Sequence, residues 1–138
     1  MDHELRTFSP QEVNQLIPVL TPLLFKLREK QDRAVKLEAQ IDALEIISDD
    51  SNENAVKELR RLTEAHHKEA TEFYSVIESI HQKGCLVKDV EKGLVDFYSV
   101  IDGKVVYLCW MLGEPQVTHW HEVGQGFGQR QPLPIKPS

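Results

Sequence analysis

Hydrophobic residues recur at alternating intervals of three and four through the first half of the chain, a spacing that predicts amphipathic helices. In the first stretch the heptad positions, interrupted by Lys30, are Leu20, Leu23, Leu27, Ala34, Leu37, Ile41 and Leu44. In the second stretch they are Val56, Leu59, Thr63, His66, Ala70, Phe73, Ile77 and Ile80. Capping residues at 48–52 form a polar turn between the two stretches. This pattern predicts a long antiparallel two-helix coiled-coil hairpin over residues 9–83.

The ends of the hairpin carry recognisable signals. Ser9 can cap a helix that begins at Pro10, and Glu12 completes a capping box. Pro18 and Pro22 each remove a backbone donor, so residues 17–22 are expected to hold a kink or the start of a second helix. Gly84 marks the C-terminal end.

The apolar stripe is widest at the base of the hairpin, where the first helix begins and the second ends. A single seam needs less apolar surface than this, so the base is expected to pack against another part of the chain. The residues predicted to be buried there against one sheet face are Leu20, Leu23, Leu27, Phe73, Ile77 and Ile80.

After Gly84 the hydrophobic period changes to that of strands. Asp102-Gly103 predicts a two-residue hairpin turn of type I′. The predicted strands are Cys85–Lys88, Leu94–Ile101, Val105–Trp110 and Val117–Glu122. The expected fold class is therefore α+β, with a small three- to four-stranded antiparallel sheet (84–130) packed on the hairpin base. Residues 131–138 are expected to form a loose tail, and 1–138 a single domain.

Charge and composition exclude some functions. The 138 residues include 16 Lys and Arg against 22 Asp and Glu, a formal charge of −6. An acidic protein is a poor binder of nucleic acids and of anionic membranes. No signal-peptide-like segment begins the chain and no apolar run approaches the roughly 20 residues of a membrane span, so a cytoplasmic location is expected. The only two cysteines, Cys85 and Cys109, lie in apolar runs typical of buried, reduced core thiols.

The most informative polar stretch contains two histidines. His119 and His121 would share one face of a strand, and Glu114 and Asp96 could approach them from neighbouring segments. Two imidazoles with a carboxylate suit a divalent transition metal such as zinc. The alternative is that His121 is a structural hydrogen-bonding residue held by Asp96 or Glu114, with His119 exposed.

A buried carboxylate needs partners, because an unpaired charge in an apolar strand is unfavourable. Asp96 lies in such a strand, and the sequence predicts that it converges with Glu114, His121 and Arg130 into one polar cluster. With Arg130 between the carboxylates, the cluster would be a structural salt-bridge network. With Arg130 pointing away, it would be a metal site.

The glycine-rich segment 124–130 superficially resembles a phosphate-binding loop. Such loops normally open a helix, whereas Pro132 and Pro134 follow here almost at once. The glycines are instead expected to let the chain wrap over the sheet, with Phe127 as a plug.

Several short motifs together resemble one known family. They are Val87-Lys88-Asp89, Gly93-Leu94-Val95-Asp96-Phe97, Leu108-Cys109-Trp110 with Val106, Gly113-Glu114, Trp120-His121, and Gly126-Phe127-Gly128 with Arg130, preceded by Phe8, Glu12, Asn14, Leu16 and Pro18. On these residues the chain resembles the uncharacterised prokaryotic domain-of-unknown-function family 2203. The resemblance implies no activity. It marks Lys88, Asp89, Asp96, Glu114, His121 and Arg130 as polar positions of the family pattern, and His119 is not among them.

No motif fixes a reaction, so two classes of function remain. The first is a self-associating or protein-interaction module. In that case the helices pair two hairpins into a homodimer, because apolar residues such as Leu24, Phe25, Val35 and Ile46 lie off the seam. The second is a small metal-binding protein or metalloenzyme that uses the His and carboxylate cluster.

Overall fold

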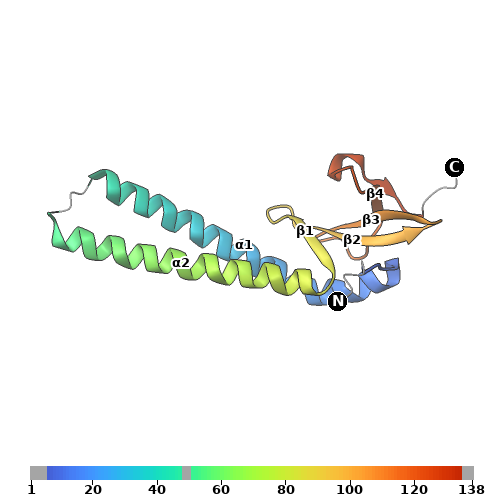
Figure 1. Ribbon diagram of the computed structural model, residues 1–138, viewed down its shortest axis with the longest axis horizontal. Helices are drawn as coiled ribbons and strands as arrows, with labels where there is room; N and C mark the ends of the chain where they lie inside the picture. Colours follow the sequence, from blue (N-terminus) through green and yellow to red (C-terminus); the bar gives the residue numbers. More distant parts are fainter. Residues whose placement is uncertain (1–5, 48–50, 135–138) are drawn as a thin grey trace. The chain divides into compact units, whose positions relative to one another are not determined.

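The computed structural model describes residues 6–47 and 51–134 (Figure 1). Two helices are followed by an antiparallel sheet, which confirms the α+β prediction. The chain divides into two compact units. The first contains residues up to Leu24 and from Glu78 onward, and the second is Phe25–Ile77. That these units form a single domain stays a prediction.

Helix α1 (Pro10–Ile47) begins as its sequence predicts. The backbone N–H of Glu12 donates to Ser9 Oγ at 3.2 Å, and the Ser9 N–H donates to Glu12 Oε1 at 3.0 Å, so both halves of the capping box are present. No second helix starts at 17–22, because α1 is one helix with Pro18 and Pro22 inside it, whereas the kink expected there stays a prediction. Both prolines lie one turn apart on the exposed side, so the carbonyls that lose a helical donor there can bond to water.

Helix α2 (Glu53–Gln82) is capped by Asn52, whose Oδ1 accepts from the Ala55 N–H at 3.1 Å. The rest of the predicted turn, 48–50, lies outside the described residues. The buried side of α2 differs from the predicted seam, of which only Ile80 is fully buried and most other positions are half-buried. It includes Leu62 and Val76 instead of Thr63, which is exposed, and Ile77, which is half-buried.

In the second unit, charged side chains form a polar layer between α1 and α2 that consists of Lys30, Arg33, Glu69 and Glu72. Lys30 forms ion pairs with Glu69, at 3.2 Å, and with Glu72. Arg33 lies 3.7 Å from Glu69 in the same layer. A polar layer of this kind specifies the register of a helix pair more than it stabilises the pair. Coiled-coil geometry for the hairpin stays a prediction.

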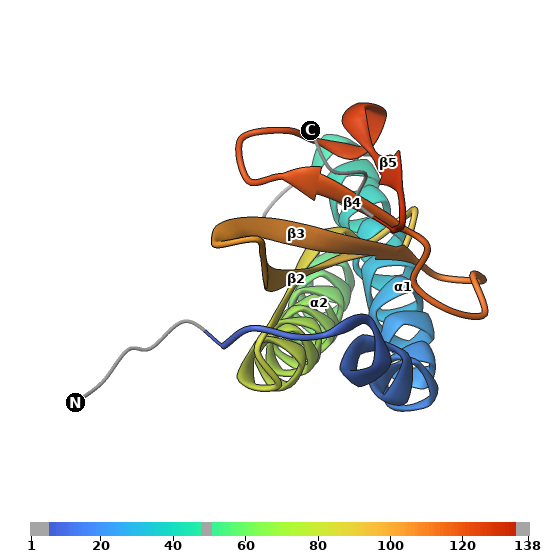
Figure 2. The same ribbon diagram turned by 90° about the vertical axis from the view of Figure 1, so that its right-hand side faces the viewer.

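The sheet has five antiparallel strands in the order of the sequence (Figure 2). They are β1 (Cys85–Asp89), β2 (Leu94–Ile101), β3 (Lys104–Met111), β4 (His119–Glu122) and β5 (Gln131–Pro132). The last strand corrects two predictions: the sheet exceeds four strands, and 131–134 is not a loose tail, because Leu133 N–H also donates to Thr118 O at 2.8 Å. Residues 135–138 lie outside the described residues.

The turn between β2 and β3 is confirmed as the predicted hairpin. Asp102 and Gly103 both have positive φ, 54° and 76°, as a type I′ turn requires. The pairing on either side runs without a bulge from Ile101 opposite Lys104 to Leu94 opposite Met111. This turn therefore determines which residues of β2 and β3 are neighbours.

One face of the sheet forms the hydrophobic core of the first unit. Phe97 meets the ring of Phe8 edge to face at 5.3 Å, and Ser99 Oγ donates to Phe8 O at 2.6 Å. The start of α1 is attached through Asn14, whose Oδ1 accepts from the Val117 N–H at 2.7 Å. The fully buried core residues of this unit include Val13, Leu20, Leu24, Ile80, Val95, Phe97, Leu108 and Trp110. Leu20 and Ile80 are buried as predicted, whereas Leu24 takes the position expected for Leu23, which is half-buried.

Candidate functional site

The other face of the sheet carries the polar residues. Side chains alternate between the two faces of a strand, so Asp96 points away from the core side occupied by Phe97. The register places Asp96 opposite Cys109, and Cys109 opposite His119. The next row on the same face contains Tyr98, Tyr107 and His121.

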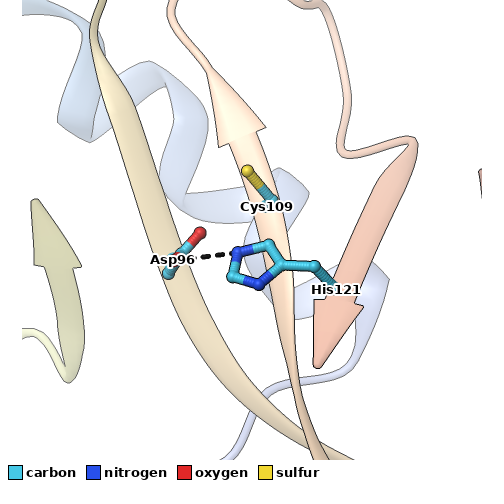
Figure 3. A group of neighbouring side chains, drawn as sticks. All are labelled: Asp96, Cys109 and His121. Atoms are coloured by element: carbon cyan, nitrogen blue, oxygen red, sulfur yellow. Dashed lines mark hydrogen bonds and ion pairs between the residues drawn. The ribbon is translucent and has the colours of Figure 1, made fainter. Parts of the chain in front are cut away.

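Three side chains converge on this face (Figure 3). Asp96 from β2, Cys109 from β3 and His121 from β4 offer ligand atoms that all lie within 4.8 Å of one another. Figure 3 shows them in front of the strands, while the start of α1 passes behind. The residues Asp96, Cys109 and His121 are 3%, 1% and 2% exposed, respectively. Nothing about packing alone requires such a polar group in a buried sheet.

Both ring nitrogens of His121 lie next to oxygen atoms that accept hydrogen bonds. Its Nδ1 lies 2.8 Å from the carbonyl oxygen of Glu122, which can only accept, so Nδ1 carries a proton. Its Nε2 lies 3.1 Å from Asp96 Oδ2, which also accepts when the carboxylate is ionised. In a neutral ring this would place a lone pair against a carboxylate oxygen. A cation between the two atoms, either a second proton or a metal ion, is needed.

The remaining carboxylate oxygen poses a second question. Asp96 Oδ1 is buried, and the donor beside it among the described residues is the Cys109 thiol, a weak donor whose contact with this carboxylate contributes to the raised pKa of Cys109. A buried charged oxygen without a partner is unfavourable by several kcal/mol in order of magnitude. This oxygen belongs to the same group of side chains, so one bound cation would serve both carboxylate oxygens better than a single weak thiol donor does.

Cys109 is a protonated thiol in the absence of a metal. Burial, and secondarily the negative charge of Asp96, raise the pKa of Cys109 to about 12, while Arg130 acts in the opposite direction. The group is not a cysteine protease-like triad, because that mechanism places the histidine between nucleophile and carboxylate. Here one nitrogen of His121 faces Asp96 and the other faces the backbone.

The structure places the four residues of the predicted polar cluster in two pairs. Asp96 pairs with His121, whereas Arg130 Nη2 donates to both carboxylate oxygens of Glu114, at 3.2 and 2.9 Å. Glu114 Oε1 also accepts from the Met111 N–H at 2.6 Å. Within residues 6–47 and 51–134, no hydrogen bond or ion pair joins Arg130 to Asp96. Arg130 is therefore not inserted between the two carboxylates.

The two other residues of the predicted metal set, His119 and Glu114, are not in the converging group. His119 lies beside Cys109 in the register, but its Nδ1 lies 2.8 Å from Thr118 Oγ1 and the side chain is only half-buried. Glu114 is held by Arg130. Cys109 takes the place that the sequence-based set gave to them.

The fold and this site define a class: an α+β protein in which a helical hairpin precedes an antiparallel sheet with a buried Asp–Cys–His group on its polar face. The chain belongs to the family described as uncharacterized conserved protein (DUF2203), whose model matches residues 6–133. This confirms the resemblance drawn from the motifs. No curated protein and no solved structure matches the chain. In the described part of the chain, neither helix has the length and apolar character needed to cross a membrane.

Proposed function

We propose that the protein binds one divalent transition-metal ion, zinc in the first place, through Asp96, Cys109 and His121. The observation that carries the proposal is the contact between His121 Nε2 and Asp96 Oδ2, two acceptor atoms held 3.1 Å apart beside a buried thiol. A metal ion would accept a lone pair from each of them.

The donor set favours zinc among the common metals. Zinc binds thiolate, imidazole and carboxylate in tetrahedral geometry at about 2.0–2.3 Å, which puts ligand atoms roughly 3.3–3.6 Å apart. The three side chains, within 4.8 Å of one another, need to close by little more than about 1 Å. One thiolate and one carboxylate would neutralise the 2+ charge, as burial demands.

The surroundings of His121 support the same assignment. A metal-binding histidine commonly donates its other ring N–H to a backbone carbonyl, which fixes the ring orientation and raises its basicity as a ligand. His121 Nδ1 does this toward Glu122 O. Three protein ligands leave one tetrahedral position, which a water molecule or another ligand would fill.

Metal analysis of protein purified without a histidine tag tests the proposal. After incubation with zinc and removal of the excess, wild type is expected to retain about one ion per chain. Asp96→Asn, Cys109→Ser and His121→Ala should each lose most of it. Cys85→Ser is the matched control, because Cys85 is the other buried thiol but lies on the opposite, apolar face.

Cobalt supplies an independent readout of the sulfur ligand. Cobalt-loaded wild type should show a thiolate-to-metal charge-transfer band that is absent in Cys109→Ser and present in Cys85→Ser. Wild type that retains no metal under these conditions would overturn the proposal. The pair of Asp96 and His121 would then be a carboxylate–imidazolium ion pair, with the second proton in place of the metal.

A second candidate function is self-association through the helical hairpin. Within the second unit, Phe25, Val35 and Tyr74 are 55%, 58% and 68% exposed, and Val35 and Tyr74 line a cleft together with Ala34, Ala70 and Phe73. Large apolar side chains at a cleft between two helices favour a second hairpin as the partner. Light scattering tests this: a mass near 15.9 kDa at high concentration would contradict a homodimer.

We also propose a cytoplasmic location. A thiolate ligand requires a reduced cysteine, and both cysteines of the chain are free and buried. Fractionation of cells that express the untagged chain would test this directly.

A further inference from the structure

The proposed metal site is buried beneath other parts of the chain. All three ligand residues are at most 3% exposed, so almost none of their surface is in contact with solvent. Metal entry and release therefore require part of the covering chain to move. Two parts of the chain reach over the polar face: Lys88 of β1, whose ammonium group lies 4.8 Å from the Tyr107 ring, and residues 123–130, which connect β4 to β5.

Contacts of Phe127 show that this segment crosses the sheet. It leaves from β4, yet the ring of Phe127 lies 5.2 Å from the ammonium group of Lys92 in the turn between β1 and β2. In the strand order, β3 and β2 separate those two places. The register points to the same face, because one residue beyond the pairing of Trp120 with Gln131 places Arg130 beside His121.

The segment has few other attachments to the body of the sheet. Its three glycines and Phe127 are exposed, and its only helical element is the 3₁₀ turn η1 (Phe127–Gln129). The ion pair of Arg130 with Glu114 fastens it, with the guanidinium also 4.9 Å from the Phe127 ring. Glu114 belongs to the turn after β3 and is itself held by the Met111 N–H. The two side chains are 9% and 20% exposed, so water screens this pair only weakly.

We propose that the Glu114–Arg130 ion pair is a latch that controls the rate of metal exchange at Asp96, Cys109 and His121. This inference rests on the proposed metal site and concerns its regulation. With the latch closed, residues 123–130 cover the ligands. When the pair opens, the segment lifts and the ion can pass.

The latch has a kinetic signature. If opening precedes both entry and release, a weaker latch speeds both steps by the same factor and leaves the equilibrium affinity unchanged. A partly buried charged hydrogen bond contributes enough that its loss should accelerate exchange by about tenfold or more. A residue that merely positions the ligands would instead change affinity.

The experiment measures cobalt uptake and cobalt release to excess chelator in wild type, Glu114→Gln and Arg130→Gln. Glutamine at 114 keeps an oxygen that can accept from the Met111 N–H while it removes the charge. Arg130→Lys retains the positive charge but lacks the planar guanidinium group with its several N–H donors, so it should give an intermediate exchange rate. Lys104→Gln is the control, because it removes an exposed ion pair with Glu122 at the far end of β4.

Faster uptake and release in Glu114→Gln and Arg130→Gln, with unchanged affinity and with Lys104→Gln like wild type, is the expected result. Wild-type rates in both variants, or a loss of affinity without faster uptake, would overturn the latch while leaving the metal site intact. Failure of wild type to bind cobalt would overturn both proposals. Tryptophan fluorescence of each variant, from Trp110 and Trp120 in β3 and β4, verifies that it is folded.

Discussion

Replacing Asp96 by alanine is the most direct test of how the polar face is held together. In the metal-free protein the substitution leaves His121 Nε2 buried without its partner at 3.1 Å, in a side chain that is 2% exposed. Breaking a buried ion pair from one side costs about 3–5 kcal/mol. Asp96 Oδ1 has only the weak Cys109 thiol beside it as a donor among the described residues, and its removal relieves part of that cost. We therefore expect the lower end of the range, about 3 kcal/mol.

Urea unfolding in the presence of a chelator measures this free energy. The protein has two tryptophans, Trp110 and Trp120, and both are buried in the strands that carry Cys109 and His121. With a slope of about 2 kcal/mol per molar urea, a loss of about 3 kcal/mol moves the midpoint down by roughly 1.5 M. Asp96→Asn keeps the shape and one acceptor oxygen, so its midpoint should fall less.

Adding zinc separates the structural part from the metal-binding part. At a free zinc concentration 100 times the dissociation constant, wild type should gain about 2.7 kcal/mol, because the ion binds only the folded state. Asp96→Ala should gain little. A wild-type midpoint for metal-free Asp96→Ala would refute the reasoning, since it would mean that His121 is satisfied without the carboxylate.

Three further predictions concern the scaffold. Leu24→Ala should destabilise the protein by about 2–5 kcal/mol in urea unfolding, whereas exposed Phe25→Ala, measured at a concentration low enough to keep the chain monomeric, should stay within about 0.5 kcal/mol of wild type. Gly84→Ala should cost at least about 1–2 kcal/mol in the same assay, because its φ of +96° is unfavourable for a side chain. Burial raises the pKa of Cys85 to about 11 and that of Cys109 to about 12, so neither thiol should react with an alkylating reagent in native protein at neutral pH, while both react after denaturation.

The features that the sequence predicted well depend on residues close together in the chain. The capping box at Ser9 and Glu12 and the turn at Asp102-Gly103 are complete within four and two residues, respectively. These two motifs are stabilised by contacts between residues close in sequence, so the local sequence pattern is enough to predict them. Strand β5 was missed for the opposite reason: Gln131–Pro132 is a two-residue strand containing a proline, and only its distant pairing with β4 defines it.

The position of Cys109 beside Asp96 was missed although the sequence contained a signal for it. A two-residue hairpin at Asp102-Gly103 pairs residues whose numbers sum to 205, and this places Cys109 opposite Asp96. Alternation with Leu108 and Trp110 indicated only that the thiol is buried. The approach of His121 from β4 could not be inferred in this way, because the connection between β3 and β4 is a longer turn that does not fix the register.

The positions of Glu114 and Arg130 show what such reasoning leaves open. Both residues lie in turns, where their side chains were expected to reach Asp96. They pair with each other instead. The Glu114 carboxylate accepts hydrogen bonds from the Met111 N–H and from Arg130 Nη2. Competition among several polar side chains for one buried carboxylate is decided by distances of a few ångströms, which no periodicity encodes.

A final prediction asks whether the polar residues serve stability at all. If they did, removing both members of the buried pair should be as damaging as removing one. Replacing a buried ion pair with apolar residues of similar volume is instead often neutral or stabilising by about 1–4 kcal/mol, because two desolvation costs disappear with the attraction. We therefore expect the double variant Asp96→Val, His121→Phe to unfold, without metal, at the wild-type urea concentration or above. The same variant should bind no zinc. A midpoint as low as that of Asp96→Ala would show that the pair supports the sheet by itself, whereas a stable double variant would show that the pair is not needed for stability, as the proposed metal site requires.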